Sequence, residues 1–292
     1  MPIDYDTLRK FRIPDVENTW TERDTMLYAL AVGMAADPLD PRELAFVLER
    51  DGRPGGGGAL RVLPTMATVL VWNDAWMYDT GIDMTKQLHG EQRIRLERPL
   101  PAAATVVGRT RITDIFDKGP GKGALMLFET EIRDKATGAL LATTVSTSYA
   151  QGEGGFGGPA GSGPAPHPIP DRAPDATFDQ ATLATQALFY RLCGDRNMLH
   201  ADPDYARRGG LPRPILHGLC TLGHACAAVT RQGCDYDASR IREVAVRFTR
   251  PVFPGETIRT EMWKDGAVVS FRSRVVERNE LVLDHGKVTL VA

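Results

Sequence analysis

Two sequence patterns occur twice in this chain, in the same order, and this repetition constrains the fold more than any other feature. Residues 25–33 (TMLYALAVG) are echoed by residues 186–194 (QALFYRLCG), and residues 95–101 (RLERPLP) are echoed by residues 247–254 (RFTRPVFP). Both echoes have a spacing of about 150 to 160 residues. We therefore predict an internal duplication, with two halves that share one fold.

The boundary between the halves falls in a segment rich in glycine and proline. Residues 151–172 contain GGFGGP and PAPHP, which disfavour regular secondary structure. We interpret this segment as a linker or a long extended crossover between an N-terminal repeat, residues 1–150, and a C-terminal repeat, residues 173–292. No helix signal follows its glycines as in a phosphate-binding loop, so we predict no nucleotide site there.

Each half combines helix signals with antiparallel-strand signals. Strands are predicted from β-rich runs separated by turn residues, at 106–115, 124–133, 140–149, 257–263, 268–277 and 281–291. An apolar stripe predicts a helix over residues 216–229, whereas the equivalent residues 64–76 have no clean stripe. We expect an α+β fold in which an antiparallel sheet wraps around a long helix, with a reduced helix in the first repeat.

Charge and composition exclude several classes of protein. The formal net charge of −2 gives no basic field for nucleic acid or an anionic membrane. No apolar run approaches the roughly 18 residues that cross a bilayer. The four cysteines have no zinc-ligand spacing, and the N-terminus is acidic and unlike a signal sequence. We expect a cytoplasmic protein with no membrane span, no nucleic-acid partner and no metal.

The segment from Gly194 to His200 is the densest group of polar residues in an apolar setting. Asp195 and His200 are five residues apart, about 140° on a straight helix, so they converge only if the helix ends near Gly194. A carboxylate and an imidazole brought together at a turn can hold one water and transfer protons near neutral pH. The pattern predicts a general acid–base pair at a helix break.

A second element follows about 20 residues later, where prolines precede His217 and Gly218 at the predicted helix start. Free N–H groups there, aided by the helix dipole, suit a developing negative oxygen, and glycine permits close approach. Together the two elements fit proton transfer next to a carbonyl. Structural interpretations remain open: Asp195 could cap a helix, and His217 could be a packed or backbone-bonded core residue.

These two elements resemble the signature of MaoC-like hydratases. The GDxNxLH pattern of residues 194–200 and the PILHG pattern of residues 214–218 are most similar to the hydratase 2 part of peroxisomal type 2 multifunctional enzymes. Shorter similar stretches are LPTM at 63–66, HGEQ at 89–92, DKG at 117–119 and GEGGFGG at 152–158. The resemblance implies a double hot-dog fold, in which one repeat keeps the catalytic segment and the other receives the acyl tail.

The resemblance also implies a role for each matched residue. Asp195 and His200 would activate the water, Asn197 would orient it, and the Gly218 N–H would polarise the thioester carbonyl. Substrate-binding residues by the same resemblance are His89, Gly90, Lys118 and Phe248, with weaker support for an assisting Glu49. Lys118 could equally be a solvated turn lysine. The family usually has proline where this chain has Met198, and proline would stiffen the turn.

Residues 32–37 (VGMAAD), the counterpart of the catalytic segment in the first repeat, lack the DxNxxH pattern, so we expect one active site per chain.

We predict a cofactor-free (R)-specific enoyl-CoA hydratase that adds water reversibly to a trans-2-enoyl-CoA to give the (3R)-3-hydroxyacyl-CoA, in fatty-acid or related acyl-CoA metabolism. Two alternatives remain: the same reaction on a steroid, polycyclic or carrier-protein-linked acyl group, and a non-catalytic acyl-CoA-binding protein. By resemblance, we expect a homodimer.

Overall fold

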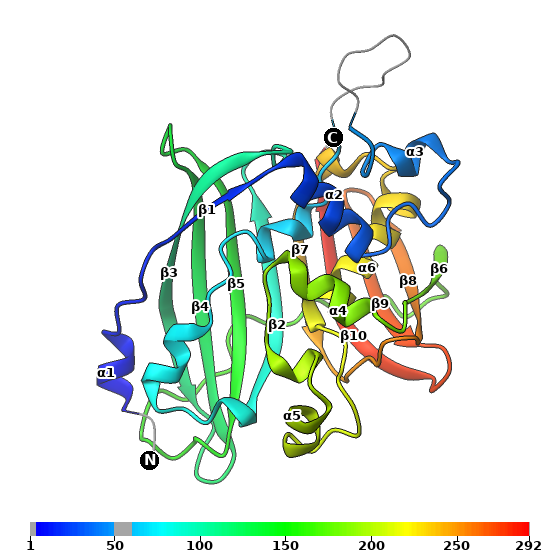
Figure 1. Ribbon diagram of the computed structural model, residues 1–292. Coiled ribbons are helices and arrows are strands. Elements are labelled where there is room, and N and C mark those ends of the chain that lie inside the picture. Colours follow the sequence, from blue (N-terminus) through cyan, green and yellow to red (C-terminus); the bar gives the residue numbers. More distant parts are fainter. Residues whose placement is uncertain (1–3, 50–59, 292) are drawn as a thin grey trace.

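A ten-stranded antiparallel sheet forms the framework of the computed structural model, which describes residues 4–49 and 60–291 (Figure 1). The strand order is β1-β3-β4-β5-β2-β7-β10-β9-β8-β6. The strands are β1 (Val16–Trp20), β2 (Gln87–Leu96), β3 (Ala104–Asp117), β4 (Gly123–Asp134), β5 (Leu140–Gln151), β6 (Ala176–Ala181), β7 (Ile241–Phe248), β8 (Thr257–Asp265), β9 (Val268–Val275) and β10 (Glu280–Leu290).

The second five strands mirror the first five. β2 and β7 lie side by side at the centre, and β1 and β6 form the two outer edges. At the central seam Glu91 pairs with Arg247, whose guanidinium also donates two hydrogen bonds to the Glu91 carboxylate, at 2.9 and 2.6 Å. This order is what two halves of one fold produce when they pair through equivalent strands, and it supports the duplication inferred from the sequence.

The six strands predicted from the sequence are all present, with ends within two residues of the expected ones. The four strands that sequence analysis did not identify are the central pair, β2 and β7, and the short edge strands, β1 and β6. The α+β prediction is confirmed.

Short helices connect and cover the strands. The α-helices are α1 (Tyr5–Arg9), α2 (Glu22–Ala31), α3 (Pro41–Leu44), α4 (Gln186–Tyr190), α5 (Pro203–Arg208) and α6 (Gly218–Gly233). The 3-10 helices are η1 (Pro64–Thr68), η2 (Ala75–Thr80), η3 (Met84–Lys86), η4 (Arg191–Cys193), η5 (Met198–His200) and η6 (Ala238–Arg240). Within the two described ranges, no helix has both the length and the hydrophobicity needed to cross a membrane.

The long helix predicted near residue 216 is α6, which has 16 residues and packs against β6, β7, β8, β9 and β10. It is buried on nearly all sides, from Leu219 to Arg231. In the first half the equivalent place is taken by η1, which has only five residues, all buried. The prediction of a reduced helix in the first repeat is confirmed. One hydrophobic core, containing residues of both halves, joins the two repeats.

The glycine- and proline-rich segment runs as an extended crossover from the end of β5 to the start of β6. Residues 152–175 form no helix or strand. The crossover is attached to the sheet at several points: Gly155 and Gly157 donate backbone N–H bonds to Asp117, and the His167 ring is 2.8 Å from the Ser270 hydroxyl. Of the two interpretations left open by the sequence, the structure has the crossover.

Candidate active site

The helical stretch that precedes the polar segment 194–200 ends at Gly194. α4 continues into η4, and Gly194 then adopts φ 150° and ψ −53°, a backbone conformation that side-chain-bearing residues rarely adopt. A β-carbon at this position would also lie 3.1 Å from the carbonyl oxygen of Val69. The break expected from the Asp195–His200 spacing is therefore present, and a glycine is required to make it.

Asp195 lies just beyond this break with only 5% of its surface exposed. Its Oδ1 atom accepts a hydrogen bond from the Asn197 backbone N–H at 3.0 Å. Burial raises the pKa of Asp195 to about 6, with a smaller contribution from the charge of Asp74, while the bond from Asn197 and the charge of Arg191 oppose the increase. Asp195 can therefore gain and lose a proton close to neutral pH.

Asn197 holds the turn between the two candidate catalytic residues. Its side-chain oxygen accepts a hydrogen bond from the Leu199 backbone N–H at 3.0 Å and caps η5. Met198, 44% exposed, is the first residue of η5. The turn is thus stabilised by the Asn197 side-chain cap, next to Met198, where the resemblance led us to expect a proline.

His200 presents one free ring nitrogen. Its Nδ1 is 2.9 Å from the carbonyl oxygen of Ile215, and because a carbonyl can only accept, Nδ1 must carry the hydrogen. Nε2 is then left with a lone pair. Burial lowers the pKa of His200 to about 4, against the opposing effect of the Ile215 bond. The ring is therefore neutral near pH 7 and can accept a proton at Nε2.

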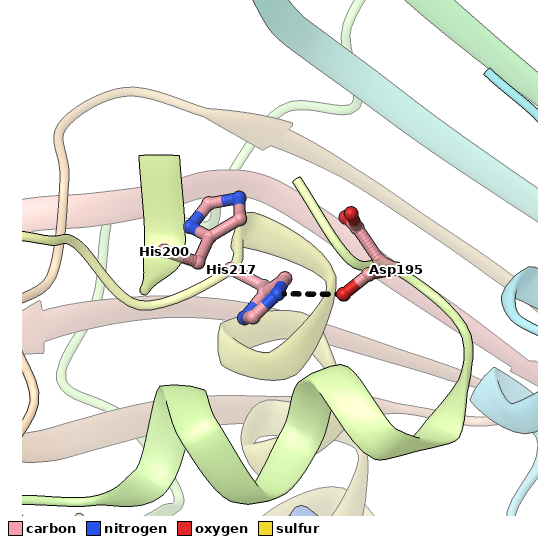
Figure 2. A group of neighbouring side chains, drawn as sticks. All are labelled: Asp195, His200 and His217. Atoms are coloured by element: carbon pink, nitrogen blue, oxygen red, sulfur yellow. Dashed lines mark hydrogen bonds between the residues drawn. The ribbon is translucent and has the colours of Figure 1, made fainter. Parts of the chain in front are cut away.

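His217 is a third member of this cluster, which sequence analysis treated as structural. Figure 2 shows its ring beside both His200 and Asp195, with a hydrogen bond from Nε2 to the Asp195 backbone oxygen, 3.2 Å long. The His200 and His217 rings stack with centroids 3.7 Å apart and an interplanar angle of 27°. Burial, followed by the proximity of His200, lowers the pKa of His217 to about 2. We interpret His217 as a neutral support for the other two.

The side chains of Asp195, His200 and His217 converge: one ligand atom of each lies within 4.8 Å of those of the other two. Such donors can bind a transition metal in principle. However, the two imidazoles are stacked and nearly parallel, so their in-plane lone pairs do not point at a common centre. A water held between the Asp195 carboxylate and His200 Nε2 fits this geometry better.

Gly218 is the first residue of α6, so its N–H is among the helix-start donors without an intrahelical acceptor. A β-carbon on Gly218 would lie 3.2 Å from the ring of Phe248, the last residue of β7. The Phe248 ring in turn packs against His89 of β2, with centroids 4.8 Å apart. Gly90 follows at an irregularity in the β2–β5 register. Three of the four predicted substrate-binding residues thus lie together near Gly218.

The other two residues suggested by the resemblance lie elsewhere. Lys118 follows the end of β3, and its Nζ donates to the Gly161 carbonyl of the crossover at 2.9 Å. Glu49 is exposed. Ala45, four residues before it, accepts a backbone hydrogen bond from Arg61, and the Arg61 guanidinium donates to the carbonyl of Tyr236, just beyond the C-terminal end of α6. Gly218, in contrast, is at the N-terminal end of that helix.

A cavity of about 280 Å³ lies next to the helix break. It is lined by β1, by α2, by residues 66–72 and by residues 192–194, and it is partly open to solvent. Its wall combines apolar and polar side chains: Val16, Glu17, Asn18, Thr19, Trp20, Asp24, Leu27, Tyr28, Met66, Val69, Leu70, Val71, Trp72, Leu192, Cys193 and Gly194. The cavity is therefore formed mainly by the first half and reaches the residue that precedes Asp195.

Comparison with known families finds a match to each half. Residues 18–152 match the family described as MFE-2 hydratase 2 N-terminal domain, and residues 166–285 match the family described as MaoC like domain. The chain is 42% identical over 275 residues to "Enoyl-CoA hydratase ChsH3" of Mycobacterium tuberculosis, covering 91% of each protein. It is 37% identical to "Enoyl-CoA hydratase 2, peroxisomal" of Arabidopsis thaliana, covering 95% of this chain and 93% of the relative.

Solved structures agree with these matches. A MaoC-like dehydratase from Phytophthora capsici superposes with a TM-score of 0.84 at 33% identity and covers 99% of both chains. A Mycobacterium tuberculosis protein described as having a double hotdog fold superposes with a TM-score of 0.60 at 19% identity, covering 96% of this chain and 94% of that one, which supports the fold alone. The chain therefore belongs to the MaoC-like hydratases of the hydratase 2 type and has their double hot-dog fold.

Proposed function

We propose that this protein is an (R)-specific enoyl-CoA hydratase, a hydro-lyase that adds water reversibly to a trans-2-enoyl-CoA to give the (3R)-3-hydroxyacyl-CoA. The main support is the convergence of Asp195 and His200 near the N-terminus of α6. The names of the relatives, enoyl-CoA hydratase and 3-hydroxyacyl-thioester dehydratase, agree with this reaction. The proposal includes no cofactor, since the substrate itself carries coenzyme A.

In the proposed reaction, Asp195 and His200 hold the reacting water. Both the ionised carboxylate and the unprotonated Nε2 accept hydrogen bonds from the water, which leaves an oxygen lone pair for attack on C3 of the substrate. The pair takes one proton as the C3–O bond forms and delivers one proton to C2. The net addition is one OH and one H, and both residues return to their starting protonation states.

Attack at C3 moves electron density through C2 toward the thioester oxygen. We assign the Gly218 N–H, at the positive end of the 16-residue α6, to donate to that oxygen as its negative charge grows. Gly218 has no side chain, so the Phe248 ring can pack against the helix start and form one wall of the site proposed for the thioester. We assign His89, Gly90 and Phe248 to the part of the substrate next to the thioester, and Lys118 to a CoA phosphate.

The test is to incubate the purified protein with trans-2-enoyl-CoA substrates from four carbons to long chains and with a steroid-like substrate. Loss of the conjugated enoyl absorbance measures hydration, and chiral chromatography identifies the product. We expect (3R)-3-hydroxyacyl-CoA, and we expect the same protein to dehydrate that compound and not its enantiomer. A (3S) product, or tight acyl-CoA binding without turnover of any substrate, would refute the proposal.

We also propose a cytoplasmic homodimer. Hot-dog proteins commonly dimerise, and all four cysteines of this chain are free thiols, as is usual in a reducing compartment. Light scattering on a size-exclusion column tests the oligomeric state, and cell fractionation tests the location. A protein that stays monomeric across the micromolar range would contradict the proposed dimer. Recovery of the protein with an organelle fraction would contradict the proposed cytoplasmic location.

A further inference from the structure

A second cavity, of about 300 Å³, lies where the crossover passes over the seam between the two repeats. Strands β2, β7 and β10 line it on one side, and residues 165–168 of the crossover line it on the other. Six of its lining residues carry ionisable side chains: Glu91, Arg93, His167, Arg247, His285 and Lys287. The candidate active site uses none of them.

This cavity and the candidate active site lie on opposite faces of the sheet. Ile94 of β2 pairs with Val244 of β7, and both are buried in the core that also contains α6. Successive side chains of a strand point to opposite faces. Arg93 and Ala245, the neighbouring pair on the same two strands, therefore point away from α6 and toward the crossover.

On this outer face Arg93, Ala245 and Lys287 form a row across three strands, because Ala245 pairs with Arg93 on one side and with Lys287 on the other. Directly opposed residues of antiparallel strands have β-carbons about 4.5–5.5 Å apart. The alanine methyl group therefore forms a low floor between two long cationic side chains. The His167 ring closes the cavity from above, 2.8 Å from the hydroxyl of Ser270, which pairs with Lys287.

Positive charge exceeds negative charge around this floor. Arg93, Arg247 and Lys287 are three cations, and the opposing carboxylates are Glu91 and, beside the cavity, Asp284, which pairs with Arg247. Glu91 binds Arg247 through one oxygen and is 3.6 Å from Arg93 through the other. Lys287 has no hydrogen bond or ion pair with any described residue. One cation is therefore left without a counter-charge.

The cationic groups are accessible from the cavity. The Arg93 and Arg247 side chains are 35% and 38% exposed, and Lys287 is half-buried. Burial, followed by the charge of Lys287, lowers the pKa of His167, which places the Lys287 ammonium close to that ring. The imidazole of His167 is thus neutral near pH 7, and the excess charge comes from the long side chains.

The arrangement suits one small anion with more than one negative charge. Guanidinium groups match the geometry of phosphate oxygens, and an ammonium adds a point charge. Cations on three sides fit a tetrahedral dianion better than a planar carboxylate with a single charge. A volume near 300 Å³ is at the lower end for small-molecule sites, so a large ligand does not fit inside.

We propose that this cavity binds the phosphate group of a small phosphorylated compound, held by Arg93, Arg247 and Lys287 above Ala245. The inference does not depend on the proposed hydratase function, because the site lies on the other face of the sheet. The phosphate can belong to the coenzyme A of a thioester or to a separate compound. The chemistry of recognition is the same for both sources.

The test is calorimetric titration of the full chain with inorganic phosphate near neutral pH, with sodium chloride holding the ionic strength constant. We expect saturable binding of one phosphate per chain with a Kd of about 1 mM or lower. Lys287→Met and Arg93→Met each remove one cation and keep an unbranched side chain. Each should raise the Kd about tenfold, the effect of losing one charge-assisted hydrogen bond.

Arg95→Met is the matched control. Arg95 points to the same face of β2, two residues from Arg93, but it pairs with Glu97 at 3.3 Å and does not line the cavity. Its loss removes the same charge and should leave the Kd unchanged. No saturable binding up to about 10 mM phosphate would overturn the proposal. So would an equal loss of affinity in all three variants, or an unchanged Kd in Lys287→Met and Arg93→Met.

Crotonyl-CoA hydration distinguishes the two sources of the phosphate. If the site takes a phosphate of coenzyme A, Lys287→Met should raise the KM for crotonyl-CoA, and inorganic phosphate should compete with this substrate. If the site takes a separate compound, the KM measured without phosphate should be the same in both proteins. Either result supports the site. Failure to hydrate any enoyl-CoA would refute the hydratase function and leave the binding result standing.

Discussion

Replacement of Asp195 by asparagine should reduce activity and increase stability at the same time. Asparagine has the same shape and can still accept the hydrogen bond from the Asn197 N–H, so the turn is retained. It has no carboxylate to exchange a proton with the reacting water. General acid–base catalysis typically contributes about 10²- to 10⁴-fold, so we expect kcat to fall by about that factor.

The expected gain in stability follows from the burial of Asp195, which raises its pKa from 3.8 to about 6. The folded protein keeps this proton at pH values where the unfolded chain has released it. The free energy of unfolding therefore decreases as the pH rises from about 4 to about 6, and the decrease persists above pH 6. At about 1.36 kcal/mol per pH unit, the ionised carboxylate costs up to about 3 kcal/mol at pH 7, which Asp195→Asn recovers.

Enoyl absorbance measures the rate, and urea unfolding followed by circular dichroism measures the stability at pH 4 and pH 7. The gain should be present at pH 7 and largely absent at pH 4. Asp179→Asn is the control, because Asp179 is a surface carboxylate paired with Arg259 and should affect both quantities little. A variant within tenfold of the wild-type rate, or one less stable than wild type at pH 7, would refute this account of Asp195.

Three further predictions concern Asp195 and the two ends of α6. The hydration rate should fall about tenfold per pH unit below pH 6, as Asp195 with its raised pKa becomes protonated, and a rate that is constant down to pH 5 would contradict the assignment. Gly218→Ala should reduce kcat/KM about 10²-fold with little change in the urea midpoint, because its methyl group would meet the Phe248 ring at 3.2 Å and shift that ring from its place in the proposed substrate site. Arg231→Met should destabilise the fold by about 3–5 kcal/mol in urea, since Glu43 would lose its buried partner at 2.6 Å, and a second change, Glu43→Leu, should restore much of the loss.

Much of the fold follows from local patterns that are visible in the sequence. The Thr- and Val-rich runs predict six of the ten strands in the described residues, and the apolar stripe predicts α6. The central strands were harder to identify because their solvent-facing positions are charged and their partner is about 150 residues away in the chain. β2, for example, contains a histidine–glycine pair at a register irregularity and then alternates Glu91, Arg93 and Arg95 with buried residues. That alternation of charged and buried residues is itself a usable signal for a strand.

The site was predictable to the extent that its residues are neighbours in sequence. The spacing of Asp195 and His200 required a break, and Gly194 provides it. The contact of His217 with both residues could not be inferred, because it depends on how the chain returns from α5 to the start of α6. The buried indole N–H groups of Trp20 and Trp72, which have no partner among the described residues, could likewise not be predicted, since an unsatisfied donor is a property of the packed structure and not of a residue type.

The seam between β2 and β7 has a consequence for how such a site can diverge. In a homodimer of single repeats, every substitution appears twice, so a helix shortened to enlarge a substrate cavity would be shortened in both copies. Here both repeats belong to one chain, and the seam forms at the high effective concentration that a covalent connection provides. One repeat can therefore retain α6 with its helix-start donor while the other reduces the equivalent segment to η1, because a substitution in one repeat leaves the other unchanged.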